Sequence, residues 1–213
     1  MTEALGLLEI IGLTPAMVAL DTLDKTASVR LLQVELNDFY GVVLKITGAT
    51  AAVQAATAAG HAVVESMGGE CISTVINAPD AEAWKAIESK PEFNPLLEAY
   101  VVRYANYESV QGRRDASAAN GKTMENYAIG LIETQGFTAV FEAIDAACKA
   151  ANVQVIGKEK LGGGYVTVLI KGDVAAVNAA VETGRARVEG LGKLIAAHVI
   201  PRPSEAVLSL IPK

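Results

Sequence analysis

The sequence is poor in the residues that build most catalytic and metal centres. It has two cysteines, two histidines and one tryptophan, and aromatic residues make up 5% of its 213 residues. Cys71 and Cys148 lack paired spacing, which predicts two reduced, largely buried thiols rather than a disulfide or a metal site. His61 and His198 have no carboxylate or cysteine at metal-ligand spacing. We therefore expect no metal, no cofactor and no catalytic residue.

Long apolar runs and basic runs are also missing. No run of membrane-spanning length is free of charge, and the N-terminus is acidic, so we expect no membrane span, no secretory signal and a cytoplasmic protein. A formal charge of −6 and a pI near 5.0 argue against a nucleic-acid partner. Hydrophobic residues make up 51%, many of them alanine, which favours close helix packing over a ligand cavity walled by rings.

Two acids stand out inside apolar, strand-like runs, Glu9 and Glu133. A carboxylate buried there needs a partner. The sequence leaves two roles open for them, a structural hydrogen bond to backbone or to a lysine, and general-base catalysis. Because it contains neither a Ser-His-Asp arrangement nor a dinucleotide-binding fingerprint, we expect that the protein is not an enzyme.

What the sequence does contain is an internal repeat. Residues 4–84 align with 128–208 without a gap at an offset of 124, and about a third of the paired positions are identical. A repeat of this period indicates two tandem domains. We place the first domain at 1–87 and the second at 127–213, and we expect 88–126 to be a linker that is partly packed, because it carries several tyrosines.

Each copy has strand and helix patterns in the order β-α-β-β-α-β. This order predicts the α+β class, with two ferredoxin-like domains whose antiparallel sheets carry helices on one face. In the first copy Thr14-Pro15 predicts a helix start, and Asp21 and Lys25 form an i,i+4 pair that recurs as Asp145 and Lys149. Strands are expected at 4–11, 29–36, 39–47 and 71–76, and further helices at 50–67 and 81–87.

A run of three glycines interrupts the second copy. The flanking residues predict a strand, a tight loop and a strand. Three consecutive glycines cost backbone entropy, so they usually lie where φ must be positive or where a Cβ would clash. A flexible hairpin and a phosphate-binding loop are alternatives, although a strand follows where a phosphate loop needs a helix. The repeat pairs Leu161, Gly162, Gly163 and Gly164 with Asn37, Asp38, Phe39 and Tyr40.

Five segments of the second copy carry motifs, at 130–136, 145–153, 160–166, 171–174 and 198–203. Through them the second copy resembles the bacterial microcompartment shell domain, and through the repeat so does the first. The resemblance implies a tandem-domain shell protein with unpermuted strand order, forming a homotrimer that is a pseudo-hexagonal plate and packs edge to edge with other shell proteins. A ferredoxin-like small-molecule sensor and a small ferredoxin-like enzyme are alternatives, the sensor resting on fold analogy alone.

The resemblance also implies site residues. The two loops paired by the repeat would line a central pore for small metabolites. A threefold ring of Asp38 would repel anions and attract cations. Phe39 would plug or gate the opening, or its ring would turn into the hydrophobic layer and leave Asp38 facing the pore.

Three basic residues correspond to the family's edge contacts. These are Lys25, Lys149 and Arg202, and the first copy has Ala78 where the second has the arginine. The lysines would also form salt bridges along their own helices. Some trimeric relatives hold an iron–sulfur cluster through a cysteine in the pore loop. Neither loop here has one, so we expect no cluster.

Overall fold

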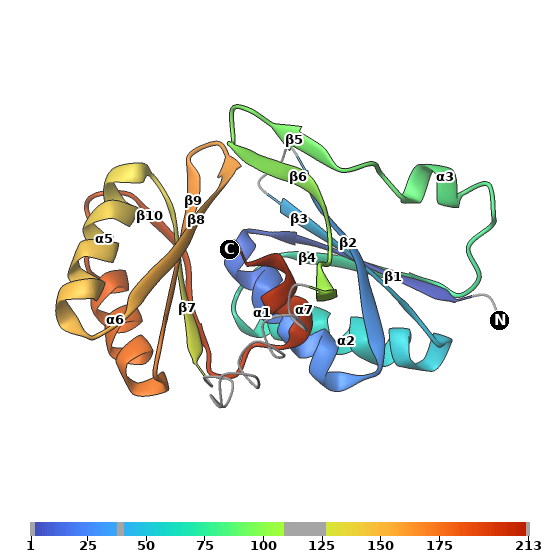
Figure 1. Cartoon of the computed structure of the whole chain (residues 1–213), viewed down its shortest axis with the longest axis horizontal. Helices are drawn as coiled ribbons and strands as arrows, with labels where there is room; N and C mark the ends of the chain where they lie inside the picture. The colour runs from blue at the N-terminus through green and yellow to red at the C-terminus, as the bar shows by residue number, and fades with distance from the viewer. Residues whose placement is uncertain (1–2, 38–40, 109–126, 212–213) are drawn as a thin grey trace. The chain divides into compact units, whose positions relative to one another are not determined.

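The computed structural model describes residues 3–37, 41–108 and 127–211, and it confirms the α+β class and the repeated β-α-β-β-α-β order (Figure 1). None of the described helices is long and apolar enough to cross a membrane. The first copy consists of β1 (Ala4–Ile11), α1 (Leu13–Thr26), β2 (Val29–Leu36), β3 (Gly41–Gly48), α2 (Thr50–Ser66) and β4 (Cys71–Ile76).

The second copy repeats these elements with nearly the same lengths. Between the copies the chain forms α3 (Trp84–Ile87), β5 (Glu92–Asn94) and β6 (Ala99–Tyr104). The second copy consists of β7 (Ala128–Gln135), α5 (Phe137–Ala150), β8 (Gln154–Gly162), β9 (Tyr165–Gly172), α6 (Val174–Ala186) and β10 (Lys193–Ile200), followed by α7 (Glu205–Leu210).

The strand order of both sheets is the ferredoxin-like one. The first sheet runs β4-β1-β3-β2 and the second runs β10-β7-β9-β8. Each copy's first strand pairs antiparallel with its third and fourth strands. This confirms the predicted unpermuted order. The first sheet continues through β6, which pairs with β2, and then β5, so part of the segment after residue 87 joins the first sheet. The domain bounds chosen from sequence stay a prediction.

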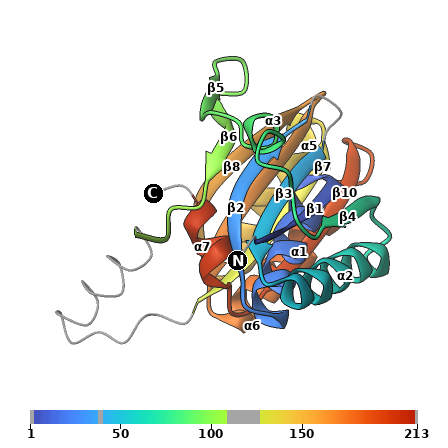
Figure 2. The same ribbon diagram turned by 90° about the vertical axis from the view of Figure 1, so that its right-hand side faces the viewer.

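The helices pack against one face of each sheet through small residues. Figure 2 shows α1 and α2 together against the first sheet. A Cβ on Gly6 of β1 would come within 2.9 Å of Thr57, Ile46 and Val53, so the glycine allows α2 to approach the strand. Gly130 of β7 has equally close neighbours at the matching repeat positions, which are Val181, Ile170 and Val177.

The start of α1 differs from the sequence prediction. Thr14 was expected to cap this helix, but the helix begins at Leu13 after Gly12, whose φ of 89° makes the sharp turn out of β1. Thr14 is therefore buried inside the first turn, where Pro15 fits because backbone N–H groups there have no partner within the helix. The helix expected at 81–87 is also shorter, beginning at Trp84.

Candidate pore loops and assembly residues

The glycine loop of the second copy is a tight turn between β8 and β9, as the sequence predicts. Its three glycines have φ values of 95°, 54° and 82° from Gly162 to Gly164, in the region that residues with a Cβ rarely adopt. A Cβ on Gly162 would meet nothing within 4 Å, so φ and not crowding requires glycine there. Leu161 is buried before the turn, whereas Gly163 is exposed. The loop therefore presents backbone rather than side chains.

In the first copy Asn37 holds the base of the matching loop. Its backbone N–H donates to the Gly41 carbonyl at 3.0 Å, and its Oδ1 accepts from the Gly41 N–H at 2.8 Å. Its Nδ2 donates to Glu9 Oε1 at 2.5 Å. The Asn37 side chain is thus folded back onto the hairpin and β1. Asp38, Phe39 and Tyr40 lie outside the described residues, and their place at a pore stays a prediction.

The two strand acids have different surroundings. Glu9 is exposed and accepts a hydrogen bond from Asn37, so the burial expected for it is wrong. Glu133 is fully buried in β7. The second copy has Leu161 where the first has Asn37, so the side-chain amide that donates to Glu9 has no counterpart at that position.

Both predicted helix salt bridges are present. Lys25 Nζ lies 2.6 Å from Asp21 Oδ2, and Lys149 Nζ lies 2.5 Å from Asp145 Oδ2. The hydrogen bond and negative charge of Asp145 raise the pKa of Lys149. Both lysine side chains are largely exposed, at 47% and 74%, so their ammonium groups also face solvent at the surface.

The third predicted edge residue is exposed as well. Arg202 follows β10, and Ala78 takes the corresponding position after β4. The side chain of Ala78 has no hydrogen-bond donor, so it cannot make the bonds that the guanidinium group of an arginine makes. Whether these positions contact neighbouring molecules stays a prediction.

The cysteines are not equivalent. Cys71 is half-buried at the start of β4, and burial together with the charge of Glu65 raises its pKa to about 11. Cys148 is exposed on α5, so the prediction that both thiols are largely buried is wrong for this one. Both are free thiols, and neither lies in the loops 37–41 or 161–164.

Among the described residues no cluster of three or more histidine, cysteine or acidic side chains could hold a metal ion. His61 Nδ1 lies 2.9 Å from Ser73 Oγ, and His61 Nε2 lies 3.4 Å from Glu65 Oε1. The first contact joins α2 to β4, and the second joins His61 to the next turn of α2. Both ring nitrogens of this histidine thus make structural contacts.

Sequence reasoning missed a buried lysine on the first sheet. Lys45 of β3 is 6% exposed, and its Nζ donates to Gln33 Oε1 at 2.9 Å, Glu35 Oε2 at 2.5 Å and the Ile87 carbonyl at 2.5 Å. Gln33 and Glu35 lie on β2, so the ammonium ties two strands to the end of α3. The signal in the sequence is that Lys45 breaks an apolar run, and that the repeat places Leu169 there.

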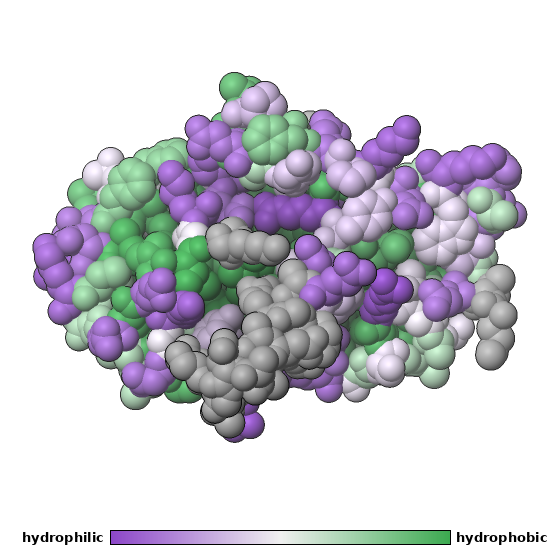
Figure 3. Space-filling model, in the orientation of Figure 1, coloured by the Kyte–Doolittle hydropathy of each residue, from purple (hydrophilic) through white to green (hydrophobic). Residues whose placement is uncertain are grey.

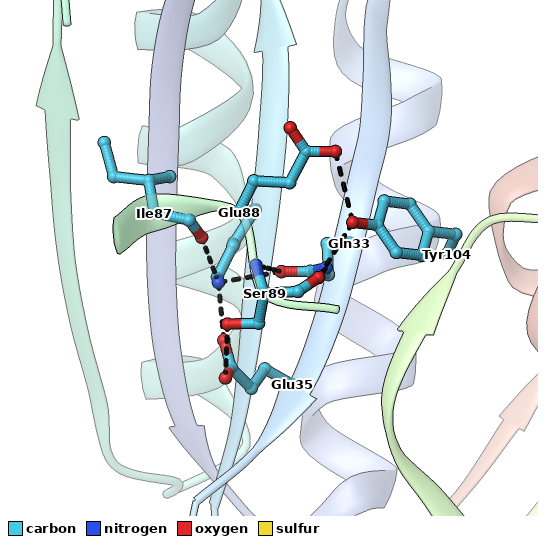
Figure 4. A network of polar contacts seen from close by, with 7 residues as sticks. Gln33, Glu35, Ile87, Glu88, Ser89 and Tyr104 are labelled. Carbon is cyan, nitrogen blue, oxygen red and sulfur yellow. Dashed lines mark hydrogen bonds and ion pairs between the residues drawn. The ribbon is translucent and has the colours of Figure 1, made fainter. Parts of the chain in front are cut away.

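The same cluster fastens the following segment to the sheet (Figure 4). Ser89 Oγ donates to Glu35 Oε1 at 3.0 Å, and Gln33 Nε2 donates to the Ser89 carbonyl at 2.7 Å. The Tyr104 hydroxyl of β6 donates to the same carbonyl at 2.8 Å. Residues 87–89 are thus held by side chains of the first sheet, and we call this group the Lys45 cluster.

The fold thus defines a class of protein built from two tandem ferredoxin-like units that share their strand order and their helix packing at Gly6 and Gly130. The BMC domain model matches residues 4–79 and 128–203. The chain therefore belongs to the bacterial microcompartment shell proteins, with two BMC domains in tandem. It is a structural shell protein and not an enzyme.

Similar curated proteins are shell proteins of several microcompartments. The microcompartment shell protein PduA of Salmonella typhimurium is 49% identical over 90 residues, which are 42% of this chain and 96% of that protein. The shell protein EutM of Escherichia coli is 49% identical over 76 residues, 36% of this chain and 78% of that protein. The carboxysome shell protein CsoS1 of Prochlorococcus marinus is 53% identical over 81 residues, 38% of this chain and 79% of that protein.

Proposed function

We propose that three chains assemble into a pseudo-hexagonal shell plate with a central pore. The observation that supports this most directly is the tandem of two BMC domains with the same strand order in one chain. Six such domains close a ring when three chains combine, and closed cyclic symmetry is the usual form of soluble homo-oligomers. The plate is then a homotrimer with six domains.

In this plate two kinds of loop alternate around the pore. The loop of Leu161 to Gly164 contributes backbone and leaves room, since its glycines carry no side chains. The loop that begins at Asn37 contributes Asp38, Phe39 and Tyr40 from each chain. Threefold Asp38 would favour cations over anions in the opening, because like charges are repelled by a ring of carboxylates. The pore therefore has threefold chemistry and passes small metabolites.

The outer rim of the plate carries the contacts to other shell proteins. Lys25 and Lys149 occupy matching places on α1 and α5, and their exposed ammonium groups are available to a neighbouring plate. Arg202 is present in one domain of each chain and Ala78 in the other. Three of the six edges would then lack the hydrogen bonds of a guanidinium group and bind neighbours less strongly.

The experiment that tests this is a mass measurement by size-exclusion chromatography with light scattering, followed by negative-stain imaging. A trimer of 22.2 kDa chains has three times that mass, about 67 kDa. We expect that mass, and sheets, tubes or closed shells when partner shell proteins are added. A monomer or dimer at micromolar concentration would refute the trimer.

A further inference from the structure

A hollow of about 400 Å³ lies in the segment that follows the first BMC domain, and we call it the Trp84 pocket. Its lining residues come from α3, from the three residues after it and from β6, and they are Trp84, Lys85, Glu88, Ser89, Lys90 and Tyr104. The matches to the BMC domain end at residue 79 and resume at 128, so the shell domain itself does not account for these residues. Pockets of about 300–1,000 Å³ are the size that small ligands occupy.

The helix that carries Trp84 has no place in the hydrophobic core. None of the four residues of α3 is buried, and Trp84 is half-buried. The repeat pairs Trp84 with Leu208 of α7, and that helix buries Ala206, Val207 and Ser209. The first copy therefore has, in place of a packed helix, a helix that directs its largest side chain to an open hollow.

The polar groups of the pocket that remain available are hydrogen-bond donors. Within the described ranges the indole N–H of Trp84 and the ammonium group of Lys90 have no hydrogen bond or ion pair. Lys85 Nζ lies 2.6 Å from Glu82 Oε2, but the two side chains are 73% and 79% exposed, so this pair is weak and its exchange for a ligand costs little. These groups select a ligand that supplies acceptors and negative charge.

The one carboxylate of the pocket is already engaged. Glu88 Oε1 accepts a hydrogen bond from the Tyr104 hydroxyl at 3.1 Å, and the same hydroxyl lies 2.8 Å from the Ser89 carbonyl (Figure 4). Burial and the hydrogen bond to Glu88 raise the pKa of Tyr104, so its hydroxyl stays protonated and neutral. The ammonium groups of Lys85 and Lys90 thus outnumber the carboxylate of Glu88, on a chain whose net charge is −6.

The Lys45 cluster holds one wall of the pocket in place. Ser89 Oγ donates to Glu35 Oε1 at 3.0 Å, and the Ser89 carbonyl accepts from Gln33 Nε2 at 2.7 Å. Tyr104 lies on β6, which pairs with β2. The wall formed by Ser89 and Tyr104 is therefore ordered before a ligand arrives, and a preorganised wall lowers the entropic cost of binding.

The surface around the pocket favours a small charged ligand over an apolar partner. In Figure 3 purple and pale side chains predominate where α3 lies in Figure 1. The rings of Trp84 and Tyr104 offer faces on which a planar base can stack, and lysine ammonium groups bind phosphate as point charges. We propose that the Trp84 pocket binds a nucleoside phosphate, with its base against the aromatic side chains and its phosphate at Lys85 and Lys90. This proposal does not depend on the trimer.

The test is direct because Trp84 is the single tryptophan of the chain. AMP added to the full chain should change the tryptophan fluorescence along a saturable curve, with a Kd below about 1 mM. Isothermal titration calorimetry should give the same Kd without using the tryptophan. Adenosine lacks the phosphate and inorganic phosphate lacks the base, so each should bind at least about tenfold more weakly than AMP. Absence of saturable AMP binding, or equal binding of AMP and adenosine, would overturn the proposal.

Substitutions assign the site, with calorimetry as the measurement and circular dichroism as the check of folding. Trp84→Ala and Lys90→Met should each weaken AMP binding at least about tenfold. Lys193→Met removes the same charge from an exposed lysine outside the pocket and should leave the affinity unchanged. Glu88→Gln should tighten binding about threefold, because it removes a negative charge and keeps an acceptor for the Tyr104 hydroxyl.

The gain expected for Glu88→Gln distinguishes a binding site from a merely structural contact, which would not bind AMP more tightly after the change. Weaker AMP binding by this variant would overturn the placement of the phosphate beside the lysines. AMP binding that Trp84→Ala and Lys90→Met leave unchanged would overturn the pocket as the site. Equal weakening by Lys193→Met would also overturn it, because the loss would then reflect net charge alone.

Discussion

The Lys45 ammonium and the Glu35 carboxylate form an ion pair 2.5 Å long on neighbouring strands of the first sheet. The lysine side chain is 7% exposed and the glutamate 30%, so the pair is largely shielded from water. The Lys45 ammonium also donates to the carbonyl of Ile87, which lies 42 positions further along the sequence. The pair therefore couples the sheet to the segment that leaves the first BMC domain.

Lys45→Met should destabilise the protein by about 3 kcal/mol, because it leaves the Glu35 carboxylate partly buried without its cation. Urea unfolding measures this change. It should also release residues 87–89, so a glutamate-specific protease should cleave after Glu88 faster than in the wild type. The control is Lys85→Met, whose ion pair with Glu82 is exposed on both sides and should change stability by no more than about 0.5 kcal/mol. Equal stability of the two variants would contradict the role of the Lys45 cluster.

Replacement of Gly163 should depend on backbone preference rather than on size. Its φ of 54° lies in the left-handed region, which asparagine tolerates better than other residues and β-branched residues tolerate worst. We expect Gly163→Ala to destabilise by about 1 kcal/mol, Gly163→Asn by less and Gly163→Val by more. Thermal melting compares the three. A loss that follows side-chain volume, with asparagine worse than alanine, would show that crowding governs the loop.

The two thiols should differ in reactivity and in pH dependence. Cys148 is exposed and should react quickly with a disulfide reagent at pH 8, whereas the raised pKa of Cys71, about 11, keeps its thiolate scarce. The rate at Cys71 should rise about tenfold per pH unit up to that pKa, since only the thiolate attacks. Cys71→Ser and Cys148→Ser assign the two rates. Equal rates at pH 8 would contradict the difference in environment.

The raised pKa of Cys71 also makes the stability of the folded protein depend on pH. The pKa of Cys71 in the folded protein is raised above its ordinary value of 9.0. Burial of the neutral thiol therefore contributes its full stabilisation of the folded state below pH 9, and this contribution falls as the pH rises toward 11. Wild type should therefore lose stability relative to Cys71→Ser above pH 9. Parallel pH profiles of the two proteins would refute this.

The repeat made the strand order and the glycine turn predictable, because matched residues such as Gly6 and Gly130 fill matched places. The surroundings of Lys45 were not predictable, since its partners come from β2 and from the end of α3, and no periodicity connects them. The exposure of Cys148, in contrast, follows from helix geometry. It comes one residue after the buried Ala147, and a helix turns by about 100° per residue, so the next position leaves the packed side.

The candidate site was predictable as a pair of loops but not in its detail. That Asn37 folds back onto Gly41 and Glu9 depends on the shape of the hairpin, which the repeat hides because the second copy has no amide there. The exposure of Phe137 and Phe141 was likewise not predictable from the sequence, since phenylalanines at helical spacing usually indicate a buried helix face.

Lys149→Glu should stop edge-to-edge assembly while the trimer forms normally. The exposed pair with Asp145 contributes only a few tenths of a kcal/mol to the helix, so the fold should be unaffected. Lys25→Glu should act in the same way on the other edges, and Lys85→Glu on the exposed α3 makes the same charge change at a residue outside the proposed edge contacts. Negative-stain imaging of sheets compares them. Sheets formed by both rim variants as well as by the control would remove the lysines from the proposed contacts.

Phe39→Gly should increase the leakage of small metabolites through an assembled shell. The residue lies outside the described part of the chain, and its effect follows from the proposed alternation of loops, in which the repeat places Phe39 beside Gly163 of the second loop. Removing three rings widens the opening and removes an apolar constriction that excludes water. Asp38→Asn separates charge from size, since it should reduce the preference for cations without a comparable change in the leakage of neutral solutes. Leakage that Phe39→Gly leaves unchanged would show that the ring faces the hydrophobic layer and that Asp38 alone sets the chemistry of the pore.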